Sequence, residues 1–205
     1  GFNVISNDIQ HYSYVTNKHF IENTGIVLPN KESNELFDYL QSLRGQEGYI
    51  FENYSLGGTI GTANERMYFS DDNAKKCDAI RIELENLLTN KEISEGMYYY
   101  ALASLLNAID KVTNTAAVYG AFLKKLKKSA QRKMELKPLE IVDGKKQYKV
   151  FNNDINILIK TISGDVLYLD PPYNERQYCA NYHMLETISK YDNPKIKGKT
   201  GLRDY

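Results

Sequence analysis

The fold of this chain is decided by the stretch Asp165-Val166-Leu167-Tyr168-Leu169-Asp170-Pro171-Pro172-Tyr173-Asn174. Residues 166–169 are an apolar run of β-branched and aromatic side chains, which predicts a buried strand of an α/β sheet. The two prolines lack a backbone donor and fix φ, so the strand ends at Asp170. We therefore expect a carboxylate, a carbonyl and an aromatic ring just past the carboxyl end of a strand. Ligands bind at that edge in open α/β sheets.

The string Asp170-Pro171-Pro172-Tyr173 is much rarer than a simple proline turn after a strand. It resembles the catalytic motif of the amino-methyltransferases, which methylate the exocyclic amine of adenine or cytosine. The resemblance implies that the amine donates hydrogen bonds to the Asp170 carboxylate and the Pro171 carbonyl. These bonds favour a tetrahedral nitrogen and stabilise its growing positive charge. Pro172 keeps the corner rigid, and Tyr173 would stack on a base that has left the duplex.

Length and composition set broad limits on the function. The chain has 205 residues, which fits one large domain or one domain with an insertion. Acidic and basic residues balance at 26 each, so a surface for a polyanion must be local. Cys77 and Cys179 show no metal-ligand spacing, and we expect reduced thiols in a cytoplasmic bacterial protein without a metal. No apolar run reaches membrane length, and no signal peptide is seen.

The first segment predicts a strand at residues 2–6 and a helix at about 10–22. Asp8 lies between them, where it is either a helix N-cap or a ligand of ribose hydroxyls. In the adenine methyltransferases an acidic residue after the second strand binds the ribose of S-adenosylmethionine, and the resemblance gives Asp8 this role. The family's glycine-rich cofactor loop is absent, and the chain starts inside a strand without Met. We expect a fragment, with residues 56–61 only a flexible loop.

The middle of the chain is predicted to be mostly helical. Two helices begin after the N-caps Ser70 and Ser94. Further helices are expected at about 34–43 and 116–132, and an aromatic loop or short strand at 48–54. The helix predicted at 116–132 carries a lysine cluster that includes Lys124 and Lys128. This cluster is either a solvated face or a set of phosphate contacts to double-stranded DNA.

Several strings in this middle part resemble bacterial adenine-specific DNA methyltransferases of restriction–modification systems, of the Dam and FokI-methylase type. In that family the region between the cofactor half and the Asp-Pro-Pro-Tyr motif recognises the target site. From the residues alone, Arg66, Asn73, Asp78 and Arg81 also fit a capped, salt-bridged helix start. The strings are residues 66–69, 73–74, 78–81 and 114–122.

The chain then returns to the sheet with a predicted strand at 146–151. Asp154 either caps a short helix at 155–160 or, as the resemblance implies, contacts the cofactor adenine. Beyond Tyr173 the family's loop flanks the target base. His183 is expected to be structural or a substrate contact, because the mechanism needs no histidine base. The residues that could stack on DNA or hydrogen-bond to it are Arg176, Tyr178, Asn181 and Tyr182.

Together these features predict an α/β protein with a partial, Rossmann-like sheet of an S-adenosylmethionine-dependent methyltransferase. Residues 1–29 and 146–205 would form the catalytic domain, and residues 30–145 a helical insertion for DNA target recognition. We expect a DNA adenine-N6 methyltransferase that protects host DNA from a cognate restriction endonuclease. The alternatives are a ribosomal RNA adenine-N6 methyltransferase and an inactive, truncated remnant that only binds DNA.

Overall fold

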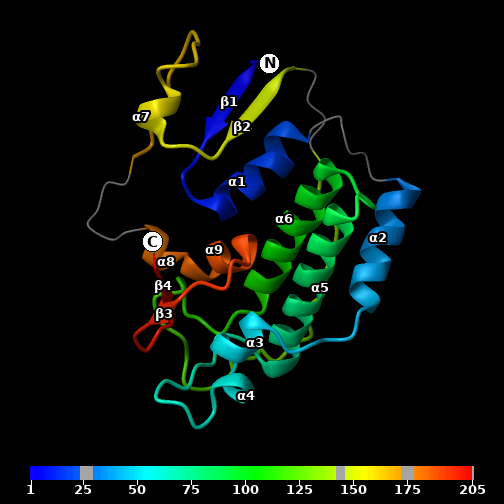
Figure 1. Cartoon of the computed structure of the whole chain (residues 1–205), viewed down its shortest axis with the longest axis vertical. Coiled ribbons are helices and arrows are strands. Elements are labelled where there is room, and N and C mark those ends of the chain that lie inside the picture. The colour runs from blue at the N-terminus through cyan, green and yellow to red at the C-terminus, as the bar shows by residue number, and fades with distance from the viewer. Residues whose placement is uncertain (24–29, 142–145, 172–177, 205) are drawn as a thin grey trace.

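The computed structural model describes residues 1–23, 30–141, 146–171 and 178–204. A block of long helices forms its body, and a small parallel sheet lies at one end (Figure 1). The buried apolar cluster draws on all three segments predicted from the sequence, with Val15 from the first and Met184 and Ile188 from the last. The division into a catalytic part and a recognition part stays a prediction.

The sheet joins two strands that lie far apart in the sequence. Strand β1 (Val4–Asn7) pairs with β2 (Tyr148–Phe151), and the register runs from Val4 opposite Tyr148 to Asn7 opposite Phe151. The strands are parallel, so the chain must cross over between them. The helical block provides this crossover, and the strands predicted at 2–6 and 146–151 are confirmed with slightly different ends.

Helix α1 (His11–Asn17) leads from the sheet into the helical block and continues as a π-helical turn, η1 (Lys18–Glu22). Both parts pack against helix α6 (Glu95–Lys111), and η1 also contacts β2. The Val150 amide donates to the Glu22 carboxylate over 2.8 Å, which ties the end of η1 to the sheet. The predicted helix at about 10–22 is thus confirmed.

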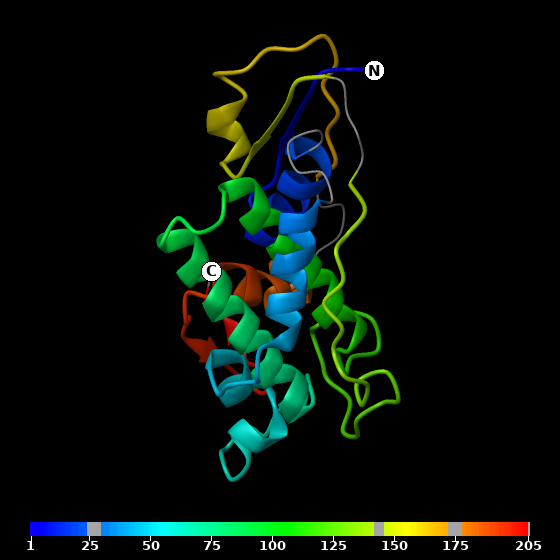
Figure 2. The same cartoon turned by 90° about the vertical axis from the view of Figure 1, so that its right-hand side faces the viewer.

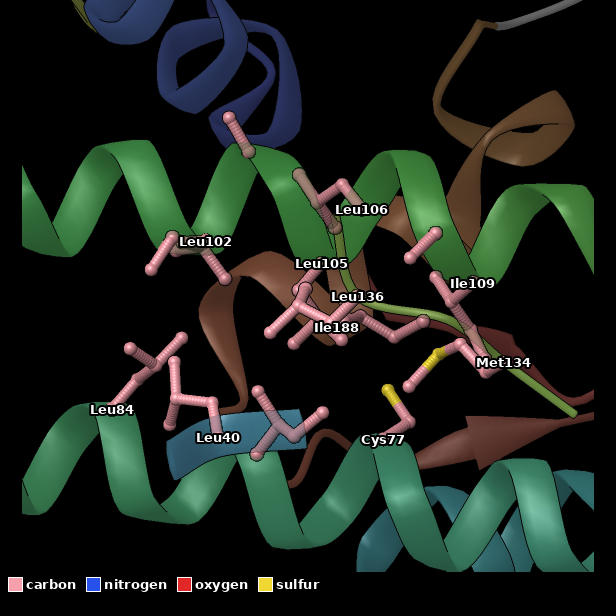
Figure 3. Packing of buried hydrophobic residues seen from close by; sticks show 14 of the residues in the cluster. Leu40, Cys77, Leu84, Leu102, Leu105, Leu106, Ile109, Met134, Leu136 and Ile188 are labelled. Atoms are coloured by element: carbon pink, nitrogen blue, oxygen red, sulfur yellow. The ribbon is translucent and has the colours of Figure 1, made fainter. Parts of the chain in front are cut away.

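Two antiparallel helices, α5 (Asp71–Thr89) and α6, form the centre of the core. Each begins as predicted, because the Ser70 side chain accepts from the Asn73 amide and the Ser94 side chain from the Met97 amide. Figure 3 shows the two helices facing each other across the core, with side chains from α2 (Lys31–Ser42), from the loop after α6 and from α9 (His183–Lys190) between them. The labelled residues are Leu40, Cys77, Leu84, Leu102, Leu105, Leu106, Ile109, Met134, Leu136 and Ile188.

Helix α2 (Lys31–Ser42) covers one side of this pair (Figure 1). Its amphipathic pattern is as predicted, with Leu36, Phe37 and Leu40 buried. Asn30 and Ser33 form a capping box, in which each side chain accepts from the other residue's amide, at 2.8 Å and 2.9 Å. The helix starts a few residues earlier than the sequence pattern suggested because this cap precedes the apolar stripe.

Residues 49–59 correct two expectations. The aromatic stretch forms helix α3 (Tyr49–Tyr54) rather than a loop or strand, and α4 (Leu56–Thr59) replaces the first part of the expected flexible loop. The Ser55 side chain caps α4 by accepting from the Gly58 amide. Gly58 must be glycine, because a Cβ there would lie 2.0 Å from the Phe51 carbonyl oxygen. This close approach makes the loop compact.

The helix expected at 116–132 is absent, and the described chain from 112 to 141 runs beside the helices as turns and extended segments (Figure 2). The reason is a competing set of polar contacts. The fully buried Asn114 donates to the Met67 and Leu123 carbonyls, both at 2.9 Å, and accepts from the Lys127 amide at 3.0 Å. These bonds satisfy backbone groups that a helix would otherwise pair.

The buried strand expected at 166–169 is also absent. After the one-turn helix α7 (Ile155–Leu158), shorter than the predicted 155–160, the chain is extended and open. The side chains of residues 166–169 are between 61% and 85% exposed. An apolar run becomes a strand only where a neighbouring strand offers backbone partners. Residues 166–169 reach neither β1 nor β2, which pair with each other.

The last segment returns to the helical block through α8 (Tyr178–Asn181) and α9 (His183–Lys190). Helix α9 packs against α1 and α6. Beyond α9, β3 (Ile196–Lys197) and β4 (Leu202–Arg203) form a small antiparallel hairpin. Arg66 holds this hairpin, donating to the Gly198 and Lys199 carbonyls at 3.0 Å and 3.1 Å.

Candidate active site

Amide side chains build the carboxyl edge of the parallel sheet. Asn7 exchanges two hydrogen bonds of 3.0 Å with the backbone of Asn153, as donor to its carbonyl and acceptor from its amide. Asn152 donates to the carbonyls of Asp8 and Ile9, at 2.7 Å and 3.0 Å. These bonds continue the pairing of β1 and β2 beyond the last ladder residues. The loops that carry Asp8 and Asp154 are therefore held side by side.

Asp8 lies at this edge with one carboxylate oxygen in use. Its Oδ1 accepts from the Gln10 amide over 2.8 Å in the turn that opens α1, and the residue is half-buried. Oδ2 makes no hydrogen bond to any described residue. The turn-forming and ligand-binding interpretations are thus compatible, because a second oxygen is left to accept from a ligand hydroxyl.

Asp154 is the N-cap of α7. Its Oδ1 accepts from the backbone and side-chain nitrogens of Asn156, at 2.8 Å and 2.9 Å, and the residue is exposed. The structure thus shows the capping role. The cofactor role that the resemblance implied stays a prediction.

A run of three tyrosine rings starts next to Asp8. The ring centroids of Tyr12 and Tyr182 are 5.7 Å apart, and those of Tyr182 and Tyr178 are 6.2 Å apart with the planes 23° from parallel. Burial raises the pKa of Tyr12, and the nearby negative charge of Asp8 raises it further. The phenol is therefore neutral near pH 7. Two of the predicted base-contacting residues, Tyr178 and Tyr182, thus lie in one row of rings with Tyr12, close to the carboxyl edge of the sheet.

Tyr12 and Glu186 are functional candidates that the sequence reasoning did not single out. The buried Glu186 carboxylate accepts from the Tyr12 amide over 3.0 Å and pairs with Lys190 over 2.8 Å. The bond connects the first turn of α1 to α9. Tyr12 lies in the first turn of α1, and Asp8 precedes the N-cap of that helix, so no helical spacing pairs the two residues. The contact of Glu186 spans 174 positions, and no local signal predicts it.

The motif itself is described only in part. Asp170 and Pro171 lie at the exposed end of the open segment after α7. Neither makes a hydrogen bond to a described residue. Pro172, Tyr173 and Arg176 lie outside the described residues. The structure thus brings Asp8, Tyr178 and Tyr182 together, whereas the position of Asp170 over the target base stays a prediction.

Asn181 and His183 meet the loop after α6 at one buried residue, Tyr119. The Tyr119 amide donates to the Asn181 carbonyl over 2.8 Å, and the Tyr119 carbonyl accepts from the Tyr68 hydroxyl at 2.8 Å. The same carbonyl lies 3.0 Å from Nε2 of His183, so that nitrogen carries the proton. Burial lowers the pKa of His183 to about 4. His183 is therefore a neutral structural donor, which is one of the two roles expected for it.

A groove of about 500 Å³ lies between this loop and α8. Lys124 and Lys128, the predicted phosphate contacts, follow the groove-lining residues in the same loop and have exposed side chains. They lie on turns and not on the predicted helix. The groove is lined by Ala116, Ala117, Val118, Gly120, Ala121, Ala180 and Asn181.

Asp78 and Arg81, two polar residues of the middle strings, are buried and bind the backbone of other elements. Asp78 caps α3, accepting from the Ile50 and Phe51 amides at 2.9 Å and 2.8 Å, and also from the Tyr191 hydroxyl at 2.6 Å. Arg81 donates to the carbonyls at the end of α9 and pairs with Glu85 over 2.9 Å. Of the salt bridges that a charged helix start would predict, the described residues show only the Arg81–Glu85 pair.

Asn73 and Arg66 have the same kind of role. Asn73 donates to the Arg132 carbonyl over 2.8 Å and accepts from the Met134 amide over 2.9 Å, which fixes the loop after α6 to the start of α5. Arg66 binds the hairpin, as described above. These side chains position other segments, and burial leaves them no access to a ligand.

Within residues 1–23, 30–141, 146–171 and 178–204, His, Cys, Asp and Glu nowhere gather in a group of three or more that could hold a metal ion. In the same ranges no helix has both the length and the apolar character needed to span a membrane.

The structure defines an α/β protein with a small parallel sheet, a large helical crossover and an acidic and aromatic cluster at the carboxyl edge of the sheet. The chain belongs to the D12 class N6 adenine-specific DNA methyltransferase family, whose sequence model matches residues 1–205.

Curated relatives agree with this family. Type II methyltransferase M.NlaIII of Neisseria lactamica is 50% identical over 202 residues, which are 98% of this chain and 58% of the relative. Type II methyltransferase M.FokI of Planomicrobium okeanokoites is 41% identical over all of this chain and 32% of its own length. Type II methyltransferase M.CviAII of Paramecium bursaria Chlorella virus 1 is 39% identical, with 59% of its length covered. The chain thus spans between about a third and three fifths of these relatives. No solved structure matches it.

Proposed function

We propose that this protein acts as an S-adenosylmethionine-dependent DNA adenine-N6 methyltransferase. The observation that carries the proposal is the row of rings Tyr12, Tyr182 and Tyr178, which begins near enough to Asp8 for its negative charge to raise the pKa of Tyr12. It connects an acidic sheet edge, suited to a nucleoside, with the segment that follows the Asp-Pro-Pro-Tyr string. A methyl donor and its acceptor base must meet at such a junction.

The fold proposal is that β1 and β2 belong to a Rossmann-like sheet of a methyltransferase. Its support is the parallel pairing of the two strands across a long helical crossover. In such a sheet the loops after the strands open at the same edge. Asp8 and Asp154 would then share one crevice.

S-adenosylmethionine is the proposed cofactor, and the groups at the sheet edge suit its nucleoside part. The open Oδ2 of Asp8 would accept from ribose hydroxyls, and Asp154 would lie beside the adenine. The cofactor, when bound, supplies an electrophilic methyl group. The chain's own task is to hold the acceptor amine in line with it and to exclude water.

At the acceptor, the Asp170 carboxylate and the Pro171 carbonyl would accept hydrogen bonds from the adenine amine. These acceptors direct the nitrogen lone pair and stabilise its developing positive charge. Pro172 keeps the corner rigid, and Tyr173 would stack on the flipped base. No histidine takes part, in agreement with the buried, neutral state of His183.

Double-stranded DNA is the proposed substrate, with Lys124 and Lys128 on phosphates and Arg176, Tyr178, Asn181 and Tyr182 around the target base. The family description specifies DNA, which favours a duplex over ribosomal RNA. The matched relatives are named type II methyltransferases. We therefore propose the same setting here, a restriction–modification system with a cognate endonuclease.

The test is Asp170→Ala, compared with Asp165→Ala, an exposed carboxylate in the same segment. Methyl transfer from labelled S-adenosylmethionine to duplex DNA should fall by at least about 100-fold in Asp170→Ala, as expected when one transition-state acceptor is lost. Duplex binding should stay near the wild-type level. Asp165→Ala should retain activity. Full activity in Asp170→Ala would contradict the assigned role, and equal loss of binding would make Asp170 a structural residue.

A further inference from the structure

The hairpin formed by β3 and β4 ends in a tight tip, residues 198–201, that packs on the helical block. Gly198 and Gly201 have positive φ angles of 69° and 68°, which favour glycine. A Cβ on Gly201 would lie 2.8 Å from Nε of Arg66 and 2.9 Å from the Tyr54 ring. The backbone of the tip is therefore held close to these two side chains.

Three of the four carbonyl groups of the tip point inward, because buried side chains donate to them. Arg66 donates from Nη2 to the Gly198 carbonyl over 3.0 Å and from Nε to the Lys199 carbonyl over 3.1 Å. The Tyr54 hydroxyl donates to the Gly201 carbonyl over 2.9 Å. Only the Thr200 carbonyl accepts from no residue of the described part of the chain.

Two consecutive amide groups of the tip therefore point outward. In a trans peptide the C=O and N–H bonds lie on opposite sides of the chain. The inward carbonyl of Gly198 thus directs the Lys199 amide outward, and the inward carbonyl of Lys199 does the same for the Thr200 amide. Neither amide donates to a described residue. Successive N–H groups on one side of a turn bind anions, so the orientation of these peptides favours an anion at the outer side of the tip.

A buried positive charge lies behind the tip. Arg66 is 8% exposed, and the described hydrogen bonds of its guanidinium all go to backbone carbonyls. No carboxylate of the described residues pairs with it. A buried charge is normally compensated by an opposite one. An anion on the outer side of the tip would provide this compensation without touching Arg66.

The exposed side chains of the hairpin add to this positive charge. Lys195 and Lys199 are exposed, and neither pairs with a carboxylate in the described part of the chain. The acidic residues beside the strands are already paired with bases of the hairpin, and the pairs are Lys197–Asp204 and Arg203–Asp192. The chain as a whole is neutral, so the hairpin is a local excess of positive charge.

We propose that the hairpin tip binds a phosphodiester of the DNA backbone, with the Lys199 and Thr200 amides as donors and the Lys199 ammonium as the exposed cation. The inference rests on the proposed function, because it takes duplex DNA as the polyanion. Figure 2 shows the hairpin and the loop that carries Lys124 and Lys128 on either side of α9, and α9 contacts β4. A duplex that contacts both is held on each side of the segment that follows the catalytic motif, which fixes its register there.

Two variants test the tip. Lys199→Gln removes an exposed charge, and Thr200→Pro removes an outward N–H group that no described residue uses. Lys31→Gln is the matched control, because that side chain is 90% exposed and lies on α2, away from the hairpin (Figure 1). Binding of a fluorescein-labelled duplex is followed by anisotropy between about 50 and 200 mM salt. Thermal unfolding checks that each variant is folded, and Lys199→Gln alone decides if Thr200→Pro is not.

Lys199→Gln should reduce the steepness of log affinity against log salt by about 1, the value for one lost phosphate contact. Thr200→Pro should weaken binding by about 10-fold or more, as expected when a hydrogen bond to a charged group is lost. Lys31→Gln should match the wild type. An unchanged salt dependence in Lys199→Gln, or an unchanged affinity in folded Thr200→Pro, with an active and DNA-binding wild type, would overturn the tip site and leave the proposed function intact. A wild type that neither binds nor methylates duplex DNA would overturn both.

Discussion

His183 shows how a residue next to predicted base contacts in the sequence can be structural in the fold. It follows the predicted base-contacting residues directly, yet it is fully buried. Nε2 donates to the Tyr119 carbonyl, and Nδ1 has no partner among the described residues. A protonated ring would place an unpaired charge in an apolar site next to Tyr54 and Tyr68. This is why its pKa is lowered.

The pH dependence of stability should report this burial. The pKa of His183 is about 4 in the folded chain and near 6.5 when unfolded, so the unfolded state binds more protons between these values. The folding stability that His183 contributes is therefore complete above about pH 6.5 and falls by up to about 3 kcal/mol as the pH drops to 4. His183→Gln keeps a donor for Tyr119 and lacks this titration. Its denaturant-unfolding free energy should depend less on pH than that of the wild type.

His11 and His19, whose pKa values burial also lowers, remain in both proteins and cancel in the comparison. The difference in unfolding free energy between wild type and His183→Gln should thus grow in favour of the wild type from pH 4 to pH 7. Parallel curves over this range would show that His183 has an ordinary pKa and is not buried.

At the scale of elements, local signals predicted those parts that local contacts determine. Ser70 and Ser94 sit at the starts of α5 and α6, and each caps its own helix within three residues. The strands β1 and β2 also follow from their own side-chain patterns, and Asp8 was placed correctly at the end of the first. For these elements the sequence pattern and the tertiary fold agree.

The elements that were predicted wrongly depend on partners far along the chain. Helix α3 needs the Asp78 carboxylate, and the loop at 116–132 needs Asn114 and Tyr119. Residues 166–169 have a strand's composition but no neighbouring strand to pair with. In the same way, the contact of Tyr12 with α9 joins residues more than 170 positions apart. The spacing of apolar residues within a short stretch of sequence does not reveal contacts with residues far along the chain.

Asp78→Ala tests how far one carboxylate determines helix α3. The change leaves the Ile50 and Phe51 amides and the Tyr191 hydroxyl without their acceptor in a buried site. We expect the free energy of unfolding to fall by about 2 to 4 kcal/mol, as when a buried hydrogen-bonded group loses its partner. Urea unfolding at neutral pH measures the loss.

Asp72→Ala is the matched control for this prediction. Asp72 lies in the first turn of the same helix, α5, but is exposed. Only its favourable position at the helix N-terminus is lost, which costs about 0.3 to 1 kcal/mol. Equal losses for the two variants would mean that Asp78 contributes no more than a surface carboxylate does.

At the scale of the whole molecule, the proposed cofactor site and the proposed phosphate contacts of Lys124 and Lys128 lie on different parts of the fold. The cofactor edge belongs to the parallel sheet, and the basic loop follows α6 (Figure 1). They are connected by α8 and α9, which contact α1 through Glu186 and the loop through Asn181. The segment after the catalytic motif is thus bonded to both sites. This arrangement lets the two binding events be disrupted separately.

Asp8→Asn should weaken the cofactor site alone. The asparagine oxygen can still accept from the Gln10 amide, so the turn into α1 is kept, whereas the negative charge offered to ribose hydroxyls is lost. A charged hydrogen bond contributes about 1.5 to 3 kcal/mol, so affinity for S-adenosylmethionine should fall by about 10- to 100-fold in calorimetry. Affinity for duplex DNA should stay unchanged, because the basic loop is untouched. Asp38→Asn, an exposed carboxylate on α2, should bind both ligands as the wild type does. Unaltered cofactor affinity in Asp8→Asn would leave Asp8 with its turn-forming role only, and a parallel loss of DNA affinity would show that the two sites are not independent.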